Sequence, residues 1–556
     1  MTLPRTLLIG LAGLLAAAPA FAAPETLDLT ILGTTDVHGH IYPTNYFGDK
    51  GNEPLGLARV ATLVKEQRAK HPHTLLVDSG DSLQGTPLTY YAARVAPRIP
   101  NPMVQAYNYL QYDAFTMGNH EYNYGIPYIM KARQEAKYPF LSGNIYKPGT
   151  TTPIYTPYVI KEVGGAKVGI LGLTTPGIMI WDRHNVEGRQ DFGDIMTAAH
   201  RWIPEMKAKG VDTIVVTIHS GLGAPYDDTY GGYAADAGAP PENVCAKLAD
   251  EFPDDISVIL LGHSHQDLPK KLHHGVLLTQ AMKWGQRLAV VDLHLEKANG
   301  KWKVTKKDST TLKTDGVKPD PGLLAATRTA HQGTLAYVNA PIGVSTGEWS
   351  AKKSRTEDTA IMDLINEVQI AKTGAHLSAA SVFNAGAHLP KGTLTVADIA
   401  SLYVYENTLT KIVLTGKQLR EYLENSASYF SAYKPGAKLF DDKQPAYNHD
   451  MVSGVDYVID TSKPVGKRIS GLKWKGKPVS DGMKFTMALN SYRQNGGGGY
   501  TMIKGAPIKQ AIYTEIRELM LDYVKEKRRI SPETTFKRNW SLVQADQVAP
   551  DGEHYK

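Results

Sequence analysis

The stretch Leu27-Asp-Leu-Thr-Ile-Leu-Gly-Thr-Thr-Asp36-Val-His38 joins an apolar run, rich in β-branched residues, to two side chains that can bind a metal ion. The run is short enough to be a buried strand, so Asp36 and His38 fall just beyond its carboxyl end. Open α/β sheets bind their ligands outside that edge. The stretch therefore predicts an α/β fold whose ligand site begins at Asp36 and His38.

Further blocks of the same kind follow in order along the first half of the chain. Asp81 follows Thr-Leu-Leu-Val-Asp, His219 follows Thr-Ile-Val-Val-Thr-Ile, and His263 follows Ile-Ser-Val-Ile-Leu-Leu-Gly. Singly, such blocks occur by chance in many chains. Because all of them follow strand-like runs, they are more plausible as metal ligands together than any one is alone. Together with Asn119 and His265 they supply enough oxygen and imidazole ligands for two divalent ions, provided that Asp81 is shared.

The ordered set Asp36/His38, Gly80-Asp81, Gly118-Asn119-His120-Glu121, His219 and Gly262-His263-Ser264-His265 resembles the calcineurin-like metallophosphoesterases. In the second half, Asn384-Ala-Gly386, Tyr405-Glu-Asn-Thr-Leu409 and Asn490 to Tyr500 look like the nucleotide-binding domain of the secreted 5'-nucleotidase family. The resemblance implies an N-terminal four-layered αββα sandwich and a C-terminal α/β substrate-binding domain, joined by a linker helix.

Within that family, the run Asn119-His-Glu-Tyr-Asn-Tyr-Gly125 resembles the periplasmic bifunctional 2',3'-cyclic-nucleotide 2'-phosphodiesterase/3'-nucleotidases. The implied activity is hydrolysis of 2',3'-cyclic and 3'-mononucleotides by attack of metal-activated water on phosphorus. One alternative is a 5'-nucleotidase or broader nucleotide phosphatase on the same metal centre. Another, from a different class, is a catalytically idle nucleotide-binding or surface protein, against which the intact ligand set argues.

The resemblance also implies a division of the metal ligands between two divalent ions. One ion would be held by Asp36, His38, Asp81 and His265, and the other by Asp81, Asn119, His219 and His263. The mixed imidazole, carboxylate and amide set suits Zn, Mn, Fe, Co or Ni, so the sequence leaves the metal open.

His120 is implied to face the phosphoryl group, where it would stabilise charge or assist the leaving oxygen. Many 5'-nucleotidases pair this histidine with an Asp that is replaced here by Asn123, which puts that dyad in doubt. Asp78 and Glu121 are expected to hold the ligand loops by hydrogen bonds rather than to bind metal. His40 is expected to be solvated.

Substrate recognition is expected in the second domain, where the resemblance places Tyr447 and Tyr492 on the two faces of the nucleobase. Asn384 and Gly386 are kept as ribose or phosphate contacts, but the arginine that 5'-nucleotidases carry after this motif is missing, which argues against a tightly held 5'-phosphate. Gly496 to Gly499 lack a phosphate-loop context. They are expected to let the backbone approach the base or ribose closely.

The first 22 residues read as a secretory signal peptide, with Arg5, an apolar core from Leu7 to Ala18, and a cleavage site at Ala20-Phe21-Ala22. This predicts a periplasmic protein, with a secreted or cell-surface location as the alternative. The single cysteine, Cys245, allows no internal disulfide and is expected to pack on a helix face. No later segment is apolar enough to span a membrane.

The rest of the chain is predicted to form three parts. These are the phosphoesterase domain at 23–318, the linker helix at 319–340 and the nucleotide-binding domain at 341–556. A chain of 556 residues is too long to fold around one hydrophobic core, which favours two domains. The formal net charge of +6 is mildly basic, which argues against a polynucleotide-binding surface. We expect a monomer whose partners are nucleotide substrates.

Overall fold

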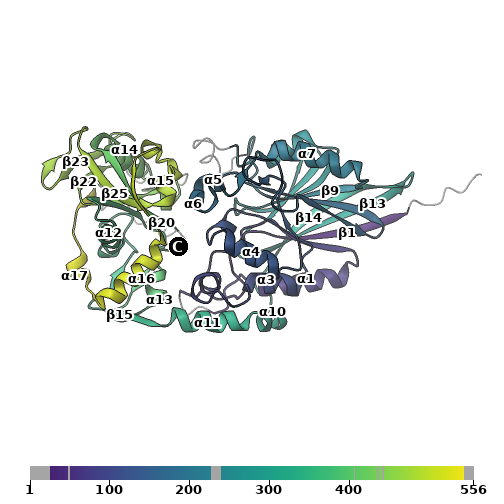
Figure 1. Cartoon of the computed structure of the whole chain (residues 1–556), viewed down its shortest axis with the longest axis horizontal. Coiled ribbons are helices and arrows are strands. Elements are labelled where there is room, and N and C mark those ends of the chain that lie inside the picture. The colour runs from purple at the N-terminus through teal and green to yellow at the C-terminus, as the bar shows by residue number, and fades with distance from the viewer. Residues whose placement is uncertain are drawn as a thin grey trace, which may run out of the picture.

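The computed structural model describes residues 25–47, 51–226, 240–405, 407–434, 438–440 and 444–543. The predicted signal peptide lies outside these residues. The chain forms two lobes side by side, with the N-terminal half in one and the C-terminal half in the other (Figure 1). Among the described residues, no helix combines the length and the apolar character that a bilayer crossing requires.

The N-terminal domain is built on two six-stranded sheets. The first has, in spatial order, β14 (Lys301–Lys313), β13 (Arg287–Ala298), β1 (Thr26–Thr34), β2 (Thr74–Asp78), β3 (Ala114–Thr116) and β4 (Phe140–Leu141). The second has β11 (Asp267–His273), β12 (Val276–Ala281), β10 (Ile256–Leu261), β9 (Thr213–His219), β7 (Ala166–Thr174) and β6 (Tyr158–Val163). Four consecutive strands of each sheet are parallel; the antiparallel pairings involve β13 and β14 at one end of the first sheet, and the edge strands β11 and β6 of the second.

The two sheets pack face to face, and helices cover their outer surfaces. In β1, Leu29 and Ile31 point into the core between the sheets, whereas Leu32 points to the helical side, as strand alternation requires. The helices are α1 (Leu57–Lys70), α2 (Pro87–Tyr90), α3 (Pro102–Leu110), α4 (Ile126–Glu135), α5 (Ile178–Trp181), α6 (Arg183–Val186), α7 (Ile195–Ala208) and α9 (Cys245–Glu251). Apolar side chains of α1 and α3 join the core outside the first sheet, and those of α7 and α9 join the core outside the second. The predicted αββα sandwich is confirmed.

The structure differs from the sequence interpretation at the end of this domain. The polar stretch after β13 forms the long edge strand β14, which pairs antiparallel with β13. Most side chains of β14 are exposed or partly exposed. The segment predicted as one linker helix forms two, α10 (Pro321–Ala326) and α11 (Arg328–Val338), because Thr327 between them has a non-helical backbone with φ −110° and ψ 8°. Asp320 caps α10 by accepting a hydrogen bond from Leu323 N at 2.8 Å.

The C-terminal domain has a five-stranded central sheet with the order β21 (Asp450–Ser453), β17 (Leu377–Ser381), β25 (Lys484–Asn490), β20 (Thr408–Thr415) and β26 (Ile508–Glu515). Smaller sheets combine β24 (Lys477–Pro478), β23 (Ile469–Trp474), β22 (Asp456–Asp460) and β28 (Trp540–Val543), then β19 (Gly392–Thr395), β15 (Pro341–Ser345) and β27 (Arg529–Ile530), and finally β16 (Trp349–Ser350) with β18 (His388–Leu389). The helices are α12 (Ala360–Thr373), α13 (Val396–Ala400), α14 (Gly416–Ala427), α15 (Ser491–Gln494), α16 (Ile516–Lys527) and α17 (Pro532–Thr535). One continuous apolar core joins these elements.

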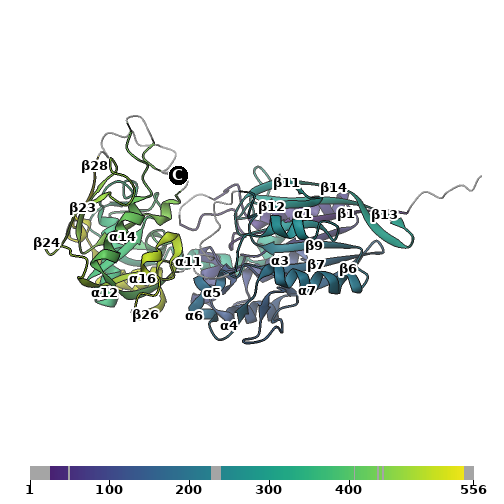
Figure 2. The same ribbon diagram turned by 90° about the horizontal axis from the view of Figure 1, so that it is seen from above.

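The two domains touch beside α5 and α6, which lie between the lobes in both ribbon views (Figures 1 and 2). Arg94 forms an ion pair with Glu515 at 2.7 Å, and the Arg517 guanidinium lies over the Tyr90 ring, 4.7 Å from its centroid. The Asn495 side chain donates a hydrogen bond to the Ile180 carbonyl at 2.7 Å. These contacts fix the facing surfaces of a cavity between the domains.

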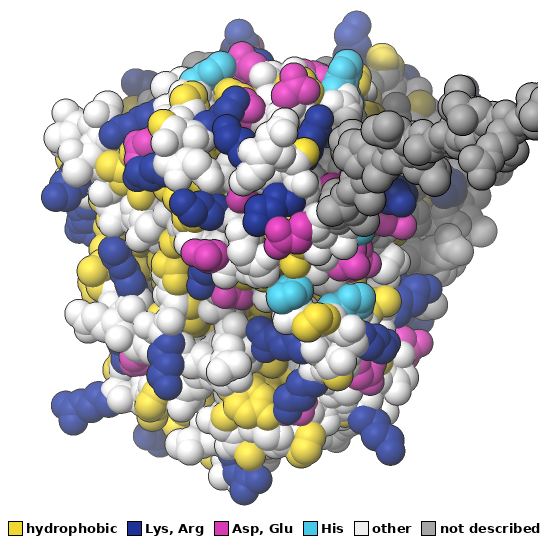
Figure 3. Space-filling model, turned by 90° about the vertical axis from the view of Figure 1, so that its right-hand side faces the viewer, with side chains coloured by type: hydrophobic (Ala, Val, Ile, Leu, Met, Phe, Trp, Pro, Cys, Tyr) yellow, Lys and Arg dark blue, Asp and Glu magenta, His cyan; other side chains and the backbone are white. Residues whose placement is uncertain are grey.

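The outer face of the N-terminal domain mixes cationic and acidic side chains (Figure 3). Lys and Arg alternate with Asp and Glu over the described part of that face, and hydrophobic side chains are scattered between them. This pattern suits a solvated surface and gathers no extended patch of one charge among the described residues.

Candidate metal centre and interdomain pocket

The parallel strands bring the predicted ligands to one edge of the sandwich. Asp36 follows β1, Asp81 follows β2, Asn119 follows β3, His219 ends β9, and His263 follows β10. Because these strands are parallel within each sheet and the sheets face one another, the loops at their carboxyl ends meet.

Most of the predicted ligands lie in a strained backbone conformation. Five non-glycine residues of the set have φ values in the left-handed region: Asp36 (51°), His38 (47°), Asp81 (59°), His263 (72°) and His265 (56°). Such residues are uncommon, each costs on the order of 1 kcal/mol or more, and they concentrate at functional sites. These loops therefore point the ligand side chains toward the site at a cost in backbone free energy.

The ligand atoms form two groups, each with its atoms within 4.8 Å of one another. The first group contains Asp36, His38 and His265, and the second contains Asp81, His219 and His263. Asp81 also approaches the first group, since its Oδ2 atom lies 3.9 Å from His38 Nε2 and 3.0 Å from His219 Nε2. With Asn119, whose Oδ1 atom lies 3.1 Å from His219 Nε2, the arrangement brings together all seven residues that the sequence singled out, and it places Asp81 between the groups.

The donor chemistry around His219 fits a cation. His219 Nδ1 donates to the Ser79 carbonyl at 2.7 Å, so its Nε2 atom is free to act as a ligand. This nitrogen faces two acceptors, Asp81 Oδ2 at 3.0 Å and Asn119 Oδ1 at 3.1 Å. Burial opposes protonation of His219, but Asp81 more than offsets it and raises the histidine pKa to about 10. A positive charge is therefore stabilised at this point.

The remaining histidines also turn ring nitrogen atoms toward the two ligand groups. His38 Nδ1 faces the Gln84 carbonyl at 3.2 Å, and its Nε2 atom lies 3.2 Å from His265 Nε2. The two nitrogens share one proton in a hydrogen bond, and a cation between them would take the place of that proton. His263 Nε2 is buried without a hydrogen-bond partner. The residues present thus fit a pair of divalent ions.

Buried carboxylates hold the ligand loops in place. Glu121 Oε2 accepts from Asp81 N at 3.0 Å and from Gly118 N at 2.7 Å, and Oε1 accepts from Ser82 N at 2.7 Å. Asp78 accepts from the hydroxyls of Thr34 at 2.6 Å and Tyr107 at 2.8 Å. Neither carboxylate belongs to a ligand group among the described residues.

Two glycines allow the loops to approach closely. A Cβ atom on Gly80, whose φ is +98°, would lie 2.7 Å from Gly118 N. A Cβ atom on Gly118 would lie 2.3 Å from Asp81 Oδ1. A side chain on Gly118 would displace the Asp81 carboxylate, and one on Gly80 would push apart the loops that follow β2 and β3.

His120 lies at the edge of this centre without belonging to either ligand group. Its backbone nitrogen donates to Asp81 Oδ1 at 2.7 Å, and its ring lies edge-on to His38 with centroids 5.0 Å apart. Its Nδ1 atom lies 2.6 Å from Asn123 Oδ1, and Asn123 Nδ2 donates to both oxygens of Asp182 at 3.1 Å. The missing carboxylate at position 123 is visible in the sequence, but Asp182 is not, because Trp181-Asp182-Arg183 matches no motif.

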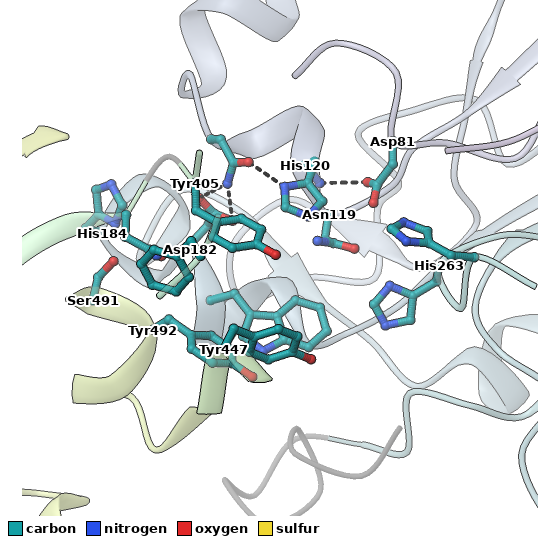
Figure 4. Close-up of a pocket in the computed structure, with 15 residues that line it drawn as sticks. Asp81, Asn119, His120, Asp182, His184, His263, Tyr405, Tyr447, Ser491 and Tyr492 are labelled. Atoms are coloured by element: carbon teal, nitrogen blue, oxygen red, sulfur yellow. Dashed lines mark hydrogen bonds between the residues drawn. The ribbon is translucent and has the colours of Figure 1, made fainter. Parts of the chain in front are cut away.

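A cavity of about 230 Å³ extends from the metal side to the second domain. The N-terminal domain lines it with His120, His263 and neighbouring groups, and the C-terminal domain lines it with Tyr447, Tyr492, Phe383 and Tyr405 among others. Figure 4 shows the labelled tyrosines across the cavity from Asp81 and His263. Sequence reasoning missed Phe383 and Tyr405 as lining residues, although Phe383 precedes the quoted Asn384-Ala-Gly386 motif and Tyr405 begins the quoted Tyr405–Leu409 motif.

Two predicted substrate contacts do not line the cavity. The Asn384 side chain donates to the Ser401 carbonyl at 3.0 Å and accepts from Gly386 N at 3.0 Å. These bonds fix the loop that carries Phe383. A direct contact of Asn384 or Gly386 with substrate stays a prediction.

Two residues of the glycine-rich run, Gly497 and Gly498, lie close to protein groups. A Cβ atom on Gly497 would lie 2.5 Å from the Tyr492 ring, and one on Gly498 would lie 2.3 Å from Asn448 Oδ1. A close approach of these glycines to a base or ribose stays a prediction. They let the backbone pack against the tyrosine and against Asn448.

Two other histidine environments are separate from this centre. His40, expected to be solvated, is half-buried and stacks on Trp284 with centroids 5.0 Å apart, and burial lowers its pKa to about 4. His273 and His274 gather near Asp250 away from the cavity, but there the His273 ring already bonds Asp250 at 2.6 Å and the Tyr226 hydroxyl at 2.8 Å.

Comparison with known families agrees with this geometry. The family described as "Calcineurin-like phosphoesterase" matches residues 29–267, and that described as "5'-nucleotidase, C-terminal domain" matches residues 341–505. A Haemophilus influenzae protein named "2',3'-cyclic-nucleotide 2'-phosphodiesterase/3'-nucleotidase" is 31% identical over 591 residues, covering 93% of this chain and 88% of that protein. The chain belongs to the 5'-nucleotidase family of calcineurin-like phosphoesterases.

Other relatives extend the comparison. The "Trifunctional nucleotide phosphoesterase protein YfkN" of Bacillus subtilis is 32% identical over 587 residues, which cover 94% of this chain but only 39% of the longer protein. A putative 5'-nucleotidase from Staphylococcus aureus, solved in complex with alpha-ketoglutarate, is 24% identical, with a TM-score of 0.79 over 93% of this chain and 100% of that one. The last likeness supports the fold. As a member of this family the chain is a metal-dependent phosphoesterase.

Proposed function

We propose that this chain is an exported hydrolase of nucleotide phosphoesters that uses two divalent ions. Its most favoured substrates are nucleoside 2',3'-cyclic phosphates and nucleoside 3'-monophosphates. The named activity of the Haemophilus relative supports this choice. The leader-like first 22 residues support a periplasmic location.

One observation carries the proposal: the metal-ligating groups and the tyrosines of the second domain line a single cavity. A phosphoryl group at Asp81 and Asn119 can therefore belong to the same small molecule as an aromatic base beside Tyr447 and Tyr492. Stacking on each ring contributes about 1 to 3 kcal/mol and tolerates all four bases. Remote binding of this kind holds the ester in place for reaction.

Bound divalent ions would supply an activated water and stabilise the charge on the phosphoryl oxygens. The protein's own groups have distinct tasks beside them. Asp36, His38, Asp81, Asn119, His219, His263 and His265 would hold the ions. His120, fixed by its backbone bond to Asp81, is placed to give a proton to the leaving oxygen or to stabilise its charge.

The charge of the cavity favours substrates with one phosphate group. None of the residues that line it is Lys or Arg. A second phosphate far from the metal ligands would thus find no cationic side chain among these residues. A nucleoside 2',3'-cyclic phosphate or 3'-monophosphate needs none. The 5'-nucleotidase alternative remains on the same centre, because a 5'-monophosphate also carries a single phosphate.

The test is phosphate release from 2',3'-cyclic, 3'- and 5'-mononucleotides, with the purified protein before and after removal of metal by a chelator. Release of nucleoside from the cyclic and 3'-substrates, lost with metal and restored by its return, supports the proposal. A strong preference for 5'-mononucleotides would favour the alternative. Activity on no nucleotide with any of Zn, Mn, Co, Fe or Ni would overturn both.

A further inference from the structure

We infer that Asp182 is a positioning residue for His120, acting through the side-chain amide of Asn123, and that Asn495 of the second domain secures this arrangement. The inference rests on the proposed phosphoester hydrolysis and extends it to side chains that belong to neither ligand group.

The three side chains form an unbroken line. His120 Nδ1 and Asn123 Oδ1 are 2.6 Å apart, and Asn123 Nδ2 lies 3.1 Å from each oxygen of Asp182. Figure 4 shows these contacts as dashed lines that run from the metal side toward Asp182. Asn123 and Asp182 both line the cavity, and Asp182 is only 4% exposed.

The donors and acceptors of the three side chains fix which end of the Asn123 amide faces His120. An amide offers an acceptor at one end and donors at the other, and a free Asn can rotate to present either end. A carboxylate only accepts, so ionised Asp182 holds Nδ2 and thereby turns Oδ1 toward His120. Burial raises the pKa of Asp182 to about 6, which leaves it mostly ionised at neutral pH.

The orientation of the amide selects a state of the histidine. Because Asn123 Oδ1 accepts, His120 Nδ1 must carry the proton, and Nε2 is left as the ring nitrogen that exchanges a proton with the substrate. A rotated amide would present a donor to Nδ1 and select the opposite tautomer. Asp182 thus orients His120 through Asn123, whereas a carboxylate at position 123 would orient it directly.

The segment that carries Asp182 is held from both sides. Asp182 lies at the junction of α5 and α6, where Asn185 Nδ2 donates to the Tyr122 carbonyl at 2.9 Å. From the second domain, Asn495 Nδ2 donates to the Ile180 carbonyl, two residues before Asp182. Asn495 follows α15, which carries Tyr492, so the base-side tyrosine and His120 are linked through one short segment.

The experiment compares four variants of the full-length, metal-loaded enzyme: Asp182→Asn, the double exchange Asn123→Asp with Asp182→Asn, Asn495→Ala, and Asp254→Asn as a matched change of an exposed carboxylate. Each is assayed with a nucleoside 3'-monophosphate and with bis(4-nitrophenyl) phosphate. The first substrate expels an alkoxide that needs a proton, whereas the second expels a stable phenolate that does not. Metal content and thermal unfolding are measured alongside.

Asp182→Asn should lower kcat for the 3'-nucleotide by about 10-fold or more, the scale usual for groups that orient an active-site histidine. The aryl ester should lose less than about 3-fold, with metal content unchanged. The double exchange restores a carboxylate next to His120 and should recover most of the loss. Asn495→Ala should act in the same direction as Asp182→Asn, and Asp254→Asn should resemble wild type.

Equal losses on both esters, or a double exchange no better than Asp182→Asn, would assign Asp182 a purely structural role and overturn the inference. An unchanged kcat in Asp182→Asn would also overturn it. If the wild-type enzyme hydrolyses neither ester, the failure lies with the proposed function instead.

Discussion

The Arg493 guanidinium and the Asp450 carboxylate form a fully buried, two-pronged ion pair in the second domain. Arg493 Nε lies 3.0 Å from Asp450 Oδ2, and Arg493 Nη2 lies 3.0 Å from Asp450 Oδ1. The same guanidinium donates to the backbone carbonyl of Tyr447, while Tyr492 is its neighbour in sequence. The pair therefore ties both predicted base-stacking tyrosines to one rigid support.

Replacing Arg493 by Ala should lower the free energy of unfolding by about 3 to 5 kcal/mol, because it leaves the Asp450 charge buried and unpaired. Urea unfolding monitored by circular dichroism measures the change. Arg538→Ala, at an exposed position, should alter stability by less than about 0.5 kcal/mol. A loss below 1 kcal/mol in Arg493→Ala would show that the pair is not the support described here.

Truncating Tyr447 or Tyr492 to Ala should weaken use of nucleotides by roughly 1 to 3 kcal/mol in kcat/KM for each ring. Hydrolysis of a small aryl phosphodiester, which has no base to stack, should stay nearly unchanged. Steady-state kinetics on both substrates separates the effects. If both substrates suffer equally, the rings support the fold rather than the base.

His120→Ala should reduce kcat by about 100-fold or more, the usual scale for a group that transfers a proton or stabilises charge in the transition state. The metal content should remain that of the wild type, because His120 belongs to neither ligand group. Elemental analysis together with kinetics measures both quantities. Metal lost in parallel with activity would make His120 a ligand and the assignment wrong.

The strands and the ligand edge could be predicted from the sequence, since buried parallel strands leave short apolar runs and ligands must follow their carboxyl ends. Asp36 and His263 illustrate this, because each follows such a run directly. The edge strand β14 could not be predicted in the same way. It is mostly exposed and highly charged, and its pairing with β13 is a tertiary property.

The residues that support the site could also not be predicted from the sequence. Asp182 lies 59 positions from Asn123, and Arg493 lies 43 positions from Asp450. Nothing local distinguishes these charges from solvated ones until the fold buries them. The glycine-rich run was recognised, but only the structure shows that Gly497 packs on Tyr492.

Stability at different pH values should respond to Asp363 in the second domain, far in sequence from the metal ligands. Burial, reinforced by Asp358, raises its pKa from 3.8 to about 7. The folded protein thus binds the proton more tightly than the unfolded chain, and the resulting stabilisation is present below pH 4 and lost as pH rises to about 7.

Asp363→Asn should remove this dependence. The variant should be more stable than wild type at pH 8 by about 1 to 2 kcal/mol, and should gain nothing at pH 4. Chemical unfolding at the two pH values, with Asp254→Asn as the exposed control, checks the sign. A greater gain at pH 4 than at pH 8 would contradict it.

The central claim, that Asp81 joins two ions in a phosphoesterase centre, is tested most directly by metal content measured together with phosphate release in wild type and Asp81→Asn. The active wild type should hold about two ions per chain. Asp81→Asn should hold one ion or none and lose most hydrolysis, while Asp78→Asn should lose much less. Full activity with two ions retained in Asp81→Asn, or equal losses in both variants, would contradict it.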